Sequence, residues 1–199
     1  TDDRYAVPEY IGKENDIQTL RQKEALAAQR CLGMKNAGFL GFADKTDASE
    51  REISLKIVDV IRRIKPDYVI TADPNLATEC HSDHIKVGEA VKYAAMDALC
   101  DFYPEFDNGK LRTDAWRVKG VGFYYTDKPN TIIDITDFEE IKMQSIKCHK
   151  SQAEPALLAA IMLQQQMFAE GTSFKAAEPL RLLNNLQMHC FNLPVISKE

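Results

Sequence analysis

The sequence has no long apolar run and no closely spaced pair of cysteines. None of its apolar stretches approaches the roughly 20 residues that a membrane helix requires, and the start Thr1-Asp2-Asp3-Arg4 does not resemble a secretory signal. The five cysteines are widely separated, which argues against a disulfide framework and against a thiolate zinc knuckle. We therefore predict that the protein contacts no membrane and works in the cytoplasm with reduced thiols.

Basic charge is also scarce, since 25 Lys and Arg residues face 30 Asp and Glu residues and the net charge is -5. This balance argues against a nucleic-acid groove, so we expect small molecules and other copies of the chain as partners. No glycine-rich phosphate loop is present, which speaks against a nucleotide-binding α/β domain. With 199 residues, of which 45% are hydrophobic, the chain is long enough for one domain over residues 1–199 with a large core.

The first half of the chain has the pattern of a β-α-β unit. Phe39–Phe42 and Tyr68–Thr71 are typical of short buried strands, and the helical periodicity of residues 50–64 lies between them. Such a crossover makes the two strands parallel, so Asp44 and Asp73, which follow them, are expected at the same edge of the sheet. Ligands of open α/β sheets bind at that edge.

Two more strands are predicted further along the chain, at residues 121–125 and 131–135, and we expect them to form a hairpin. A Met- and Leu-rich helix follows at residues 155–169. Its apolar stripe is typical of packing on the domain or on another subunit, and we expect a homo-oligomer. The residues of the stripe are Leu157, Ile161, Leu163 and Phe168.

The junction after the strand Tyr68–Thr71 holds the most distinctive residues, Cys80-His81-Ser82-Asp83-His84. Ser82 or Asp83 is expected to cap a helix there. His81 and His84 are three positions apart, so within a first helical turn they share a face and suit one ligand or metal ion. The alternative is an ordinary solvated and capped helix terminus.

Two other groups of candidate residues have equally simple alternatives. Arg21 and Glu24 share one face of a predicted helix, and they fit a surface ion pair as well as a functional pair. His149 is either a site residue or a cation that is favourable at the end of a helix.

Four motifs in order resemble the PIG-L/LmbE-type family of metal-dependent N-acetylglucosaminyl deacetylases. They are Arg21-Gln22-Lys23-Glu24 followed by Leu32-Gly33, Lys65-Pro66-Asp67-Tyr68-Val69-Ile70-Thr71, His81-Ser82-Asp83-His84, and His149-Lys150-Ser151-Gln152. The resemblance implies a Rossmann-like α/β fold, with a mostly parallel sheet and helices on both faces. It also implies removal of an acetyl group from an N-acetylated amino sugar, with Zn²⁺ or another divalent metal as cofactor.

The resemblance also implies roles for residues of the His81–His84 motif. His84 resembles the third metal ligand of the family, and His81 resembles the histidine that stabilises the oxyanion. Asp83 is expected to orient a histidine. The ion itself polarises the amide carbonyl of the substrate.

Four residues outside this motif resemble those that bind the substrate. Arg21 and Asp44 match positions that grip sugar hydroxyls in the family. His149 and Gln152 are expected near the site.

The chain departs from the family pattern in two places. Glu79 stands where some relatives carry a tyrosine, whose contribution is then absent or comes from Tyr124 or Tyr125. The family's strand ending in His-Pro-Asp-Asp, which supplies two metal ligands and the general base, has no counterpart here. We expect an upstream segment to supply the missing ligands. The alternative is a non-catalytic sugar-binding or assembly homologue that has lost the metal site.

Overall fold

The computed structural model describes residues 14–101, 110 and 113–189, which fall into two compact units. The unit that we call the sheet unit contains Ala48–Thr131 and Leu180–Glu199. The unit that we call the helical unit combines Thr1–Asp47 with Ile132–Pro179. Each unit is described by itself.

Four strands form one mixed sheet in the order β1-β2-β4-β3. β1 (Tyr68–Ala72) and β2 (Gly120–Tyr124) are parallel, with Tyr68 opposite Gly120 and Ala72 opposite Tyr124. β4 (Ala177–Asn184) runs antiparallel to β2. The α/β class expected from the sequence is confirmed.

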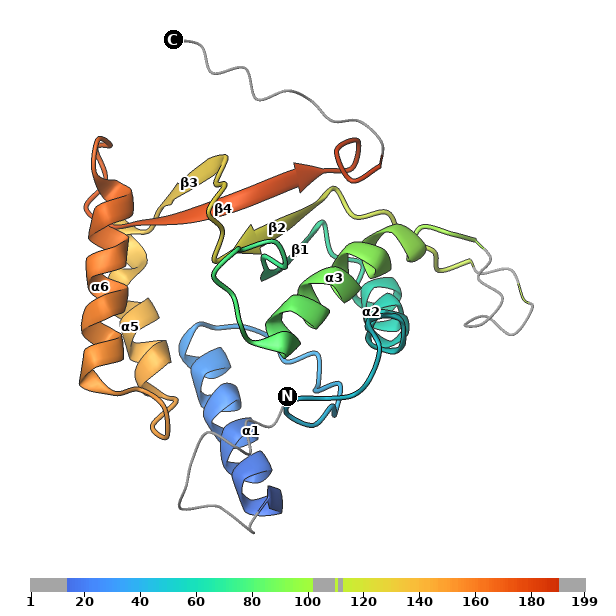
Figure 1. Cartoon of the computed structure of the whole chain (residues 1–199), viewed down its shortest axis with the longest axis horizontal. Coiled ribbons are helices and arrows are strands. Elements are labelled where there is room, and N and C mark those ends of the chain that lie inside the picture. The colour runs from blue at the N-terminus through green and yellow to red at the C-terminus, as the bar shows by residue number, and fades with distance from the viewer. Residues whose placement is uncertain (1–13, 102–109, 111–112, 190–199) are drawn as a thin grey trace. The chain divides into compact units, whose positions relative to one another are not determined.

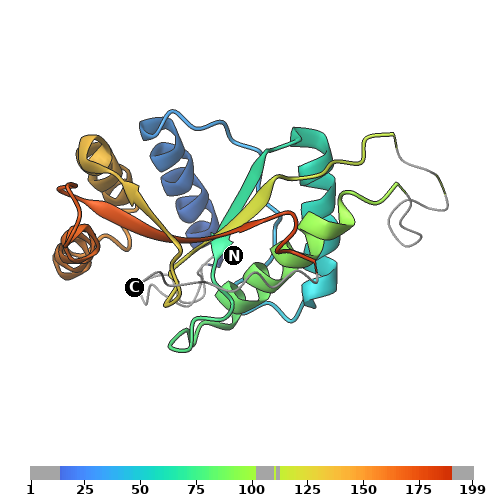
Figure 2. The same ribbon diagram turned by 90° about the horizontal axis from the view of Figure 1, so that it is seen from above.

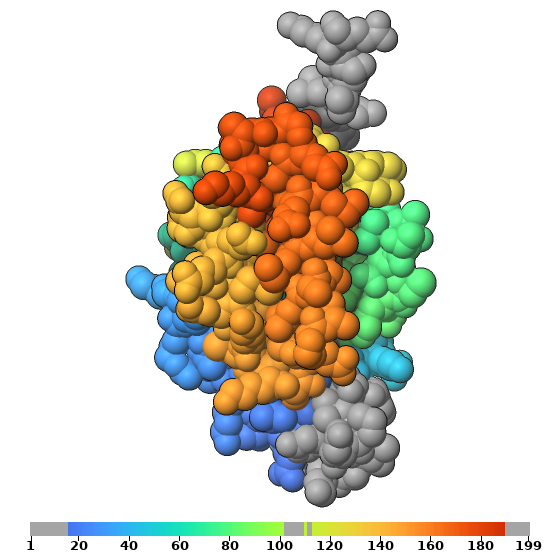
Figure 3. Space-filling view, turned by 90° about the vertical axis from the view of Figure 1, so that its left-hand side faces the viewer, coloured from blue at the N-terminus to red at the C-terminus, as the bar shows by residue number. Residues whose placement is uncertain are grey.

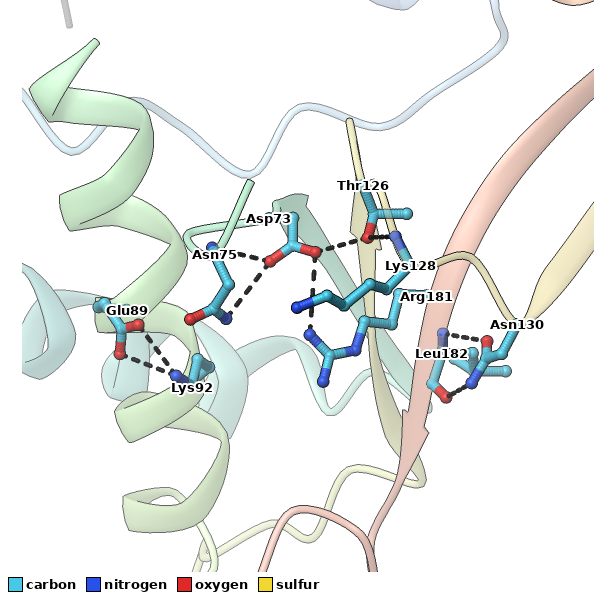
Figure 4. Close-up of polar contacts among 9 residues, drawn as sticks. All are labelled: Asp73, Asn75, Glu89, Lys92, Thr126, Lys128, Asn130, Arg181 and Leu182. Atoms are coloured by element: carbon cyan, nitrogen blue, oxygen red, sulfur yellow. Dashed lines mark hydrogen bonds and ion pairs between the residues drawn. The ribbon is translucent and has the colours of Figure 1, made fainter. Parts of the chain in front are cut away.

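The predicted hairpin is wrong, because β4 lies between β2 and β3 (Thr131–Asp134). Asn130 helps to hold β4 in this position, as Figure 4 shows: its amide oxygen accepts the Leu182 N–H at 2.8 Å, and its amide nitrogen donates to the Leu182 carbonyl at 2.9 Å. β4, about 50 positions later in the chain, thus lies beside β2. A short turn after β2 would have placed β3 there.

The helices α2 (Glu50–Ile64) and α3 (Ser82–Asp97) lie side by side next to the strands of the sheet unit (Figures 1 and 2). α2 begins as expected, since Ser49 and Glu52 form a capping box in which each side chain accepts the backbone N–H of the other residue. The core of the unit is made of buried apolar side chains from both helices, from β2 and from the segment before it. They are Val58, Ile61, Val91, Ala94, Ala95, Ala98, Val118, Val121 and Phe123.

Both ends of α3 are fixed by close contacts. Near its start, a Cβ atom added to Gly88 would lie 2.7 Å from the Ala72 carbonyl oxygen and 2.8 Å from Pro74 Cδ, so only glycine allows this approach. Beyond its end, the buried Arg62 guanidinium donates to the carbonyls of Ala98 and Cys100, which a helix terminus leaves without intrahelical partners. The second turn of α3, which contains Gly88, is thereby held against the carboxyl end of β1.

The expected strand Phe39–Phe42 does not form. Gly38 and Gly41 adopt φ values of 108° and 77°, which interrupt an extended strand, and Phe39 is 46% exposed instead of buried. Asp44 therefore follows a loop rather than a strand, and the first half of the expected β-α-β unit is wrong.

The helical unit contains α1 (Glu14–Cys31), the 3₁₀ helix η2 (Thr136–Phe138), α5 (Glu139–Lys147) and α6 (Pro155–Ala169). α1 packs against α5. No helix in the described part of the chain is both long and apolar enough to span a membrane.

The outer surface of α6 is shown in orange in Figure 3, beside α5. Leu157 and Leu163 are 45% and 59% exposed, so packing on the chain's own domain is wrong for these two side chains. Ile161 and Phe168 of the same stripe are partly buried. Packing of this face on another subunit stays a prediction.

Candidate functional site

The two histidines of the motif lie together at the start of α3. His81 is the N-cap residue, with φ -85° and ψ 109°, and the helix begins at Ser82. The backbone N–H of His84 donates to the His81 carbonyl at 3.1 Å, and the two rings stack with centroids 4.6 Å apart and an interplanar angle of 21°. The shared face expected from the spacing is therefore present. The expected cap was wrong, because neither Ser82 nor Asp83 occupies the N-cap position.

Glu79 joins the two histidines. Its Oε2 lies 2.8 Å from His84 Nδ1, and its Oε1 accepts the backbone N–H of His81 at 2.7 Å. Hydrogen bonds from the His84 ring and from the His81 backbone lower the pKa of Glu79, so this carboxylate is ionised at neutral pH. Sequence reasoning noted Glu79 only as a departure from the family pattern and missed this contact.

Asp83 lies in the first turn of α3 and is buried, with 3% of its surface exposed. A negative charge in the first turn of a helix is favoured by the free backbone N–H groups there. Its expected role in orienting a histidine stays a prediction.

Asp73 follows β1 directly and connects two loops (Figure 4). Its Oδ1 accepts the Asn75 N–H at 2.9 Å, which closes a turn after the strand. Its Oδ2 accepts the Thr126 hydroxyl at 2.6 Å and lies 4.0 Å from Arg181 Nη1. Asp73 thus fixes the segments that follow β1 and β2.

Tyr124 and Tyr125 lie at the carboxyl end of β2, where the Asp73 N–H donates to the Tyr124 carbonyl at 2.9 Å. Their rings meet edge to face, with centroids 4.9 Å apart. Burial raises the pKa of Tyr124, so its phenol stays protonated at neutral pH and is able to donate a hydrogen bond. The sequence left open whether Tyr124 or Tyr125 takes the role of the tyrosine that some relatives carry at the position of Glu79, and this stays untested.

In the helical unit, Arg21 and Glu24 are buried at 7% and 6% exposure, so the surface ion pair considered for them is wrong. Arg21 Nη1 lies 3.8 Å from Glu24 Oε2. The Glu24 carboxylate accepts the Ser151 N–H at 2.9 Å and the Ser151 hydroxyl at 2.6 Å. Glu24 therefore ties α1 to the loop that contains His149 and Gln152, a role that the sequence did not reveal.

The other candidates of the helical unit, unlike the two on α1, lie in loops. Asp44 is buried at 7% exposure. His149 follows the C-cap residue Cys148 of α5, and its carbonyl accepts the N–H groups of Gln152 and Ala153 in a tight turn. Gln152 is exposed.

One of the candidate residues is suited to hold a metal ion. His84 fits as one ligand, because Glu79 occupies Nδ1 while Nε2 has no hydrogen-bond partner among the described residues, and the side chain is 48% exposed. The described residues contain no group of three His, Cys, Asp or Glu side chains that would complete a site. A catalytic zinc site uses about three protein ligands, of which His84 would be one.

Comparison with known proteins agrees with the motif. Residues 3–95 match the family model PIG-L, described as GlcNAc-PI de-N-acetylase. The diacetylchitobiose deacetylase of Thermococcus kodakarensis is 35% identical over 144 residues, which are 69% of this chain and 51% of that protein. Over residues 3–95 the chain thus resembles the PIG-L family. The resemblance inferred from the four motifs is therefore confirmed.

Two further relatives are named as deacetylases of a related compound. A probable N-acetyl-α-D-glucosaminyl L-malate deacetylase 2 of Bacillus subtilis is 24% identical over 150 residues, or 74% of this chain and 64% of that protein. Its counterpart in Bacillus cereus is 27% identical over 143 residues, or 71% of this chain and 61% of that protein. The chain thus spans about half the length of the archaeal relative and under two thirds of the Bacillus relatives.

Solved structures show the same fold. The N,N'-diacetylchitobiose deacetylase of Pyrococcus horikoshii matches with a TM-score of 0.77 and 26% identity, over 89% of this chain and 68% of that one. A conserved protein of Thermus thermophilus matches with a TM-score of 0.72 and 24% identity, over 85% of this chain and 74% of that one. The second likeness shows the fold alone.

Proposed function

We propose that the protein is a metal-dependent hydrolase that removes an acetyl group from an N-acetylated amino sugar or sugar conjugate. The observation that carries this proposal is the pair of stacked histidines at the start of α3, with a carboxylate on Nδ1 of His84, inside the segment that matches the PIG-L family. The names of the relatives support N-acetylglucosamine compounds as the substrate class.

Each residue of the motif has a distinct role in this proposal. His84 would hold the metal, zinc by preference, through Nε2. When bound, the ion supplies the Lewis acidity that polarises the amide carbonyl. His81 donates a hydrogen bond to the carbonyl oxygen as that oxygen gains negative charge. Asp83 orients a histidine from its buried position.

We propose that two further metal ligands and the general base come from a segment with a His-Pro-Asp-Asp motif that extends the sheet at β1. β1 stands at one end of the strand order. Tyr68 and Ile70, on one face of β1, are 52% and 61% exposed, which is unusual for apolar side chains of a parallel strand. A neighbouring strand and its connection would cover this face.

We also propose a reducing cytoplasmic location. Cys31, Cys80, Cys100 and Cys148, the cysteines that the structure describes, are free thiols, which supports this proposal.

A second candidate function is sugar binding without catalysis. The observation in its favour is the incomplete ligand set of the described residues. One experiment separates the two functions: metal content and acetate release from N-acetylglucosamine conjugates are measured on the chain alone and on the chain co-expressed with a segment ending in His-Pro-Asp-Asp. We expect metal-dependent acetate release from the chain that is co-expressed with this segment. Sugar binding without acetate release from either preparation would instead support the non-catalytic function.

For Arg21 and Asp44 we propose binding of sugar hydroxyl groups. Arg21→Ala is expected to raise KM about tenfold or more and to change kcat little, because a hydrogen bond to a charged group contributes about 1.5–3 kcal/mol to ground-state binding. Steady-state kinetics on the same conjugates would measure both constants. Arg30→Ala, in the exposed last turn of the same helix, is the control and should leave KM unchanged. A fall in kcat at constant KM would contradict this role.

A further inference from the structure

We propose that Glu79 is a positioning residue, which fixes His84 so that its Nε2 atom is presented to a divalent cation. This inference rests on the proposed function, because it takes His84 as a metal ligand. Glu79 stands two residues before His81, outside the His81–His84 motif.

The tautomer argument follows from the 2.8 Å contact between Glu79 Oε2 and His84 Nδ1. A carboxylate offers acceptor oxygens, so this contact is a hydrogen bond when the hydrogen atom is on Nδ1. In neutral imidazole the other nitrogen then carries the lone pair, and a metal ion binds that lone pair. Glu79 therefore selects the form of His84 that is able to bind metal through Nε2.

The second oxygen of Glu79 fixes the position of the carboxylate itself. Oε1 accepts the His81 N–H at 2.7 Å, at the N-cap of α3. The Glu79 side chain is only 15% exposed, whereas His84 is 48% exposed. The half-exposed imidazole of His84 is thus held by the less exposed Glu79 carboxylate, which is itself bound to the backbone. These contacts limit rotation of the His84 ring before any metal binds.

Glu89 provides a matched control for the loss of one negative charge near α3. Glu89 lies on the same helix, 24% exposed, and its carboxylate binds Lys92 Nζ at 2.9 Å (Figure 4). Glu89→Gln removes one negative charge from the helix without touching either histidine. Any effect shared by the Glu79 and Glu89 variants is then due to charge, and an effect of Glu79 variants alone is due to its contacts.

The experiment compares wild type, Glu79→Ala, Glu79→Gln and Glu89→Gln. Nitrogen-15 NMR of the metal-free proteins reports which ring nitrogen of His84 carries hydrogen, and competition with a chelator measures Zn²⁺ affinity. Both measurements are made on the protein form that supports acetate release. We expect the Nδ1–H form in wild type and in Glu89→Gln, a mixture of forms in Glu79→Ala, and Zn²⁺ affinity 10- to 100-fold weaker in Glu79→Ala. Glu79→Gln keeps an acceptor oxygen of the same reach, so its loss should be smaller.

The outcomes separate this inference from the proposed function. Equal Zn²⁺ affinity in wild type and Glu79→Ala, or a wild-type His84 that carries its hydrogen on Nε2, would overturn the positioning role and leave the proposed function intact. No Zn²⁺ uptake by wild type and by Glu89→Gln would overturn the proposed function, and the inference with it. Circular dichroism melting curves check folding. If Glu79→Ala is unfolded, Glu79→Gln decides: unchanged affinity and tautomer overturn the inference, and a loss of either beyond that of Glu89→Gln supports it.

Discussion

His84→Ala is expected to lose both its metal ion and its acetate-releasing activity. The proposed metal site has about three ligands, and removal of one imidazole lowers affinity as well as distorting the geometry of the remaining ligands. Alanine also leaves the Glu79 carboxylate without the ring that it now contacts at 2.8 Å, so an ionised group remains beside the altered site. Metal content after dialysis and acetate release from N-acetylglucosamine conjugates measure the two losses.

His189→Ala is the control for His84→Ala. His189 belongs to the same unit and is exposed, but it lies outside the motif at the start of α3. This variant should keep the metal content and activity of the wild type. Full zinc occupancy in His84→Ala would refute the role of His84 as a ligand.

Sequence patterns predicted the parts of the fold that depend on neighbouring residues. The helix Glu50–Ile64 has helical periodicity and the strand Tyr68–Ala72 has the sequence pattern of a short buried strand, so both were found with nearly correct bounds. The shared face of His81 and His84 also follows from helical spacing alone, and the structure has it.

The parts that depend on distant residues were not predicted. The strand β4 separates β2 from β3, and no local pattern shows that a segment near residue 180 takes that edge. The buried Glu24 binds Ser151, which is 127 positions away in the chain. Glu79 was overlooked for a different reason: its contact with His84 spans only five positions, but it requires the loop between β1 and α3 to turn back on the helix, and sequence spacing does not specify that turn.

His81→Ala is expected to reduce kcat by roughly 10²-fold or more while the metal is retained, since removal of one oxyanion donor has an effect of this size. The structure explains why the metal should stay. The contact between residue 81 and Glu79 Oε1 is made by the backbone N–H at 2.7 Å, so alanine keeps it. Glu79 then still holds His84 Nδ1, although the stacked ring at 4.6 Å is lost.

The His81 prediction is checked by measuring kcat, KM and metal content on the same preparation of His81→Ala. If His81 acts on the developing oxyanion, kcat and kcat/KM fall together and KM changes little, because the lost interaction exists only in the transition state. His84→Ala serves as the contrasting variant, since it should lose metal and activity together. A metal-depleted His81→Ala would show that His81 helps to hold the ion, and the role in oxyanion stabilisation would then be wrong.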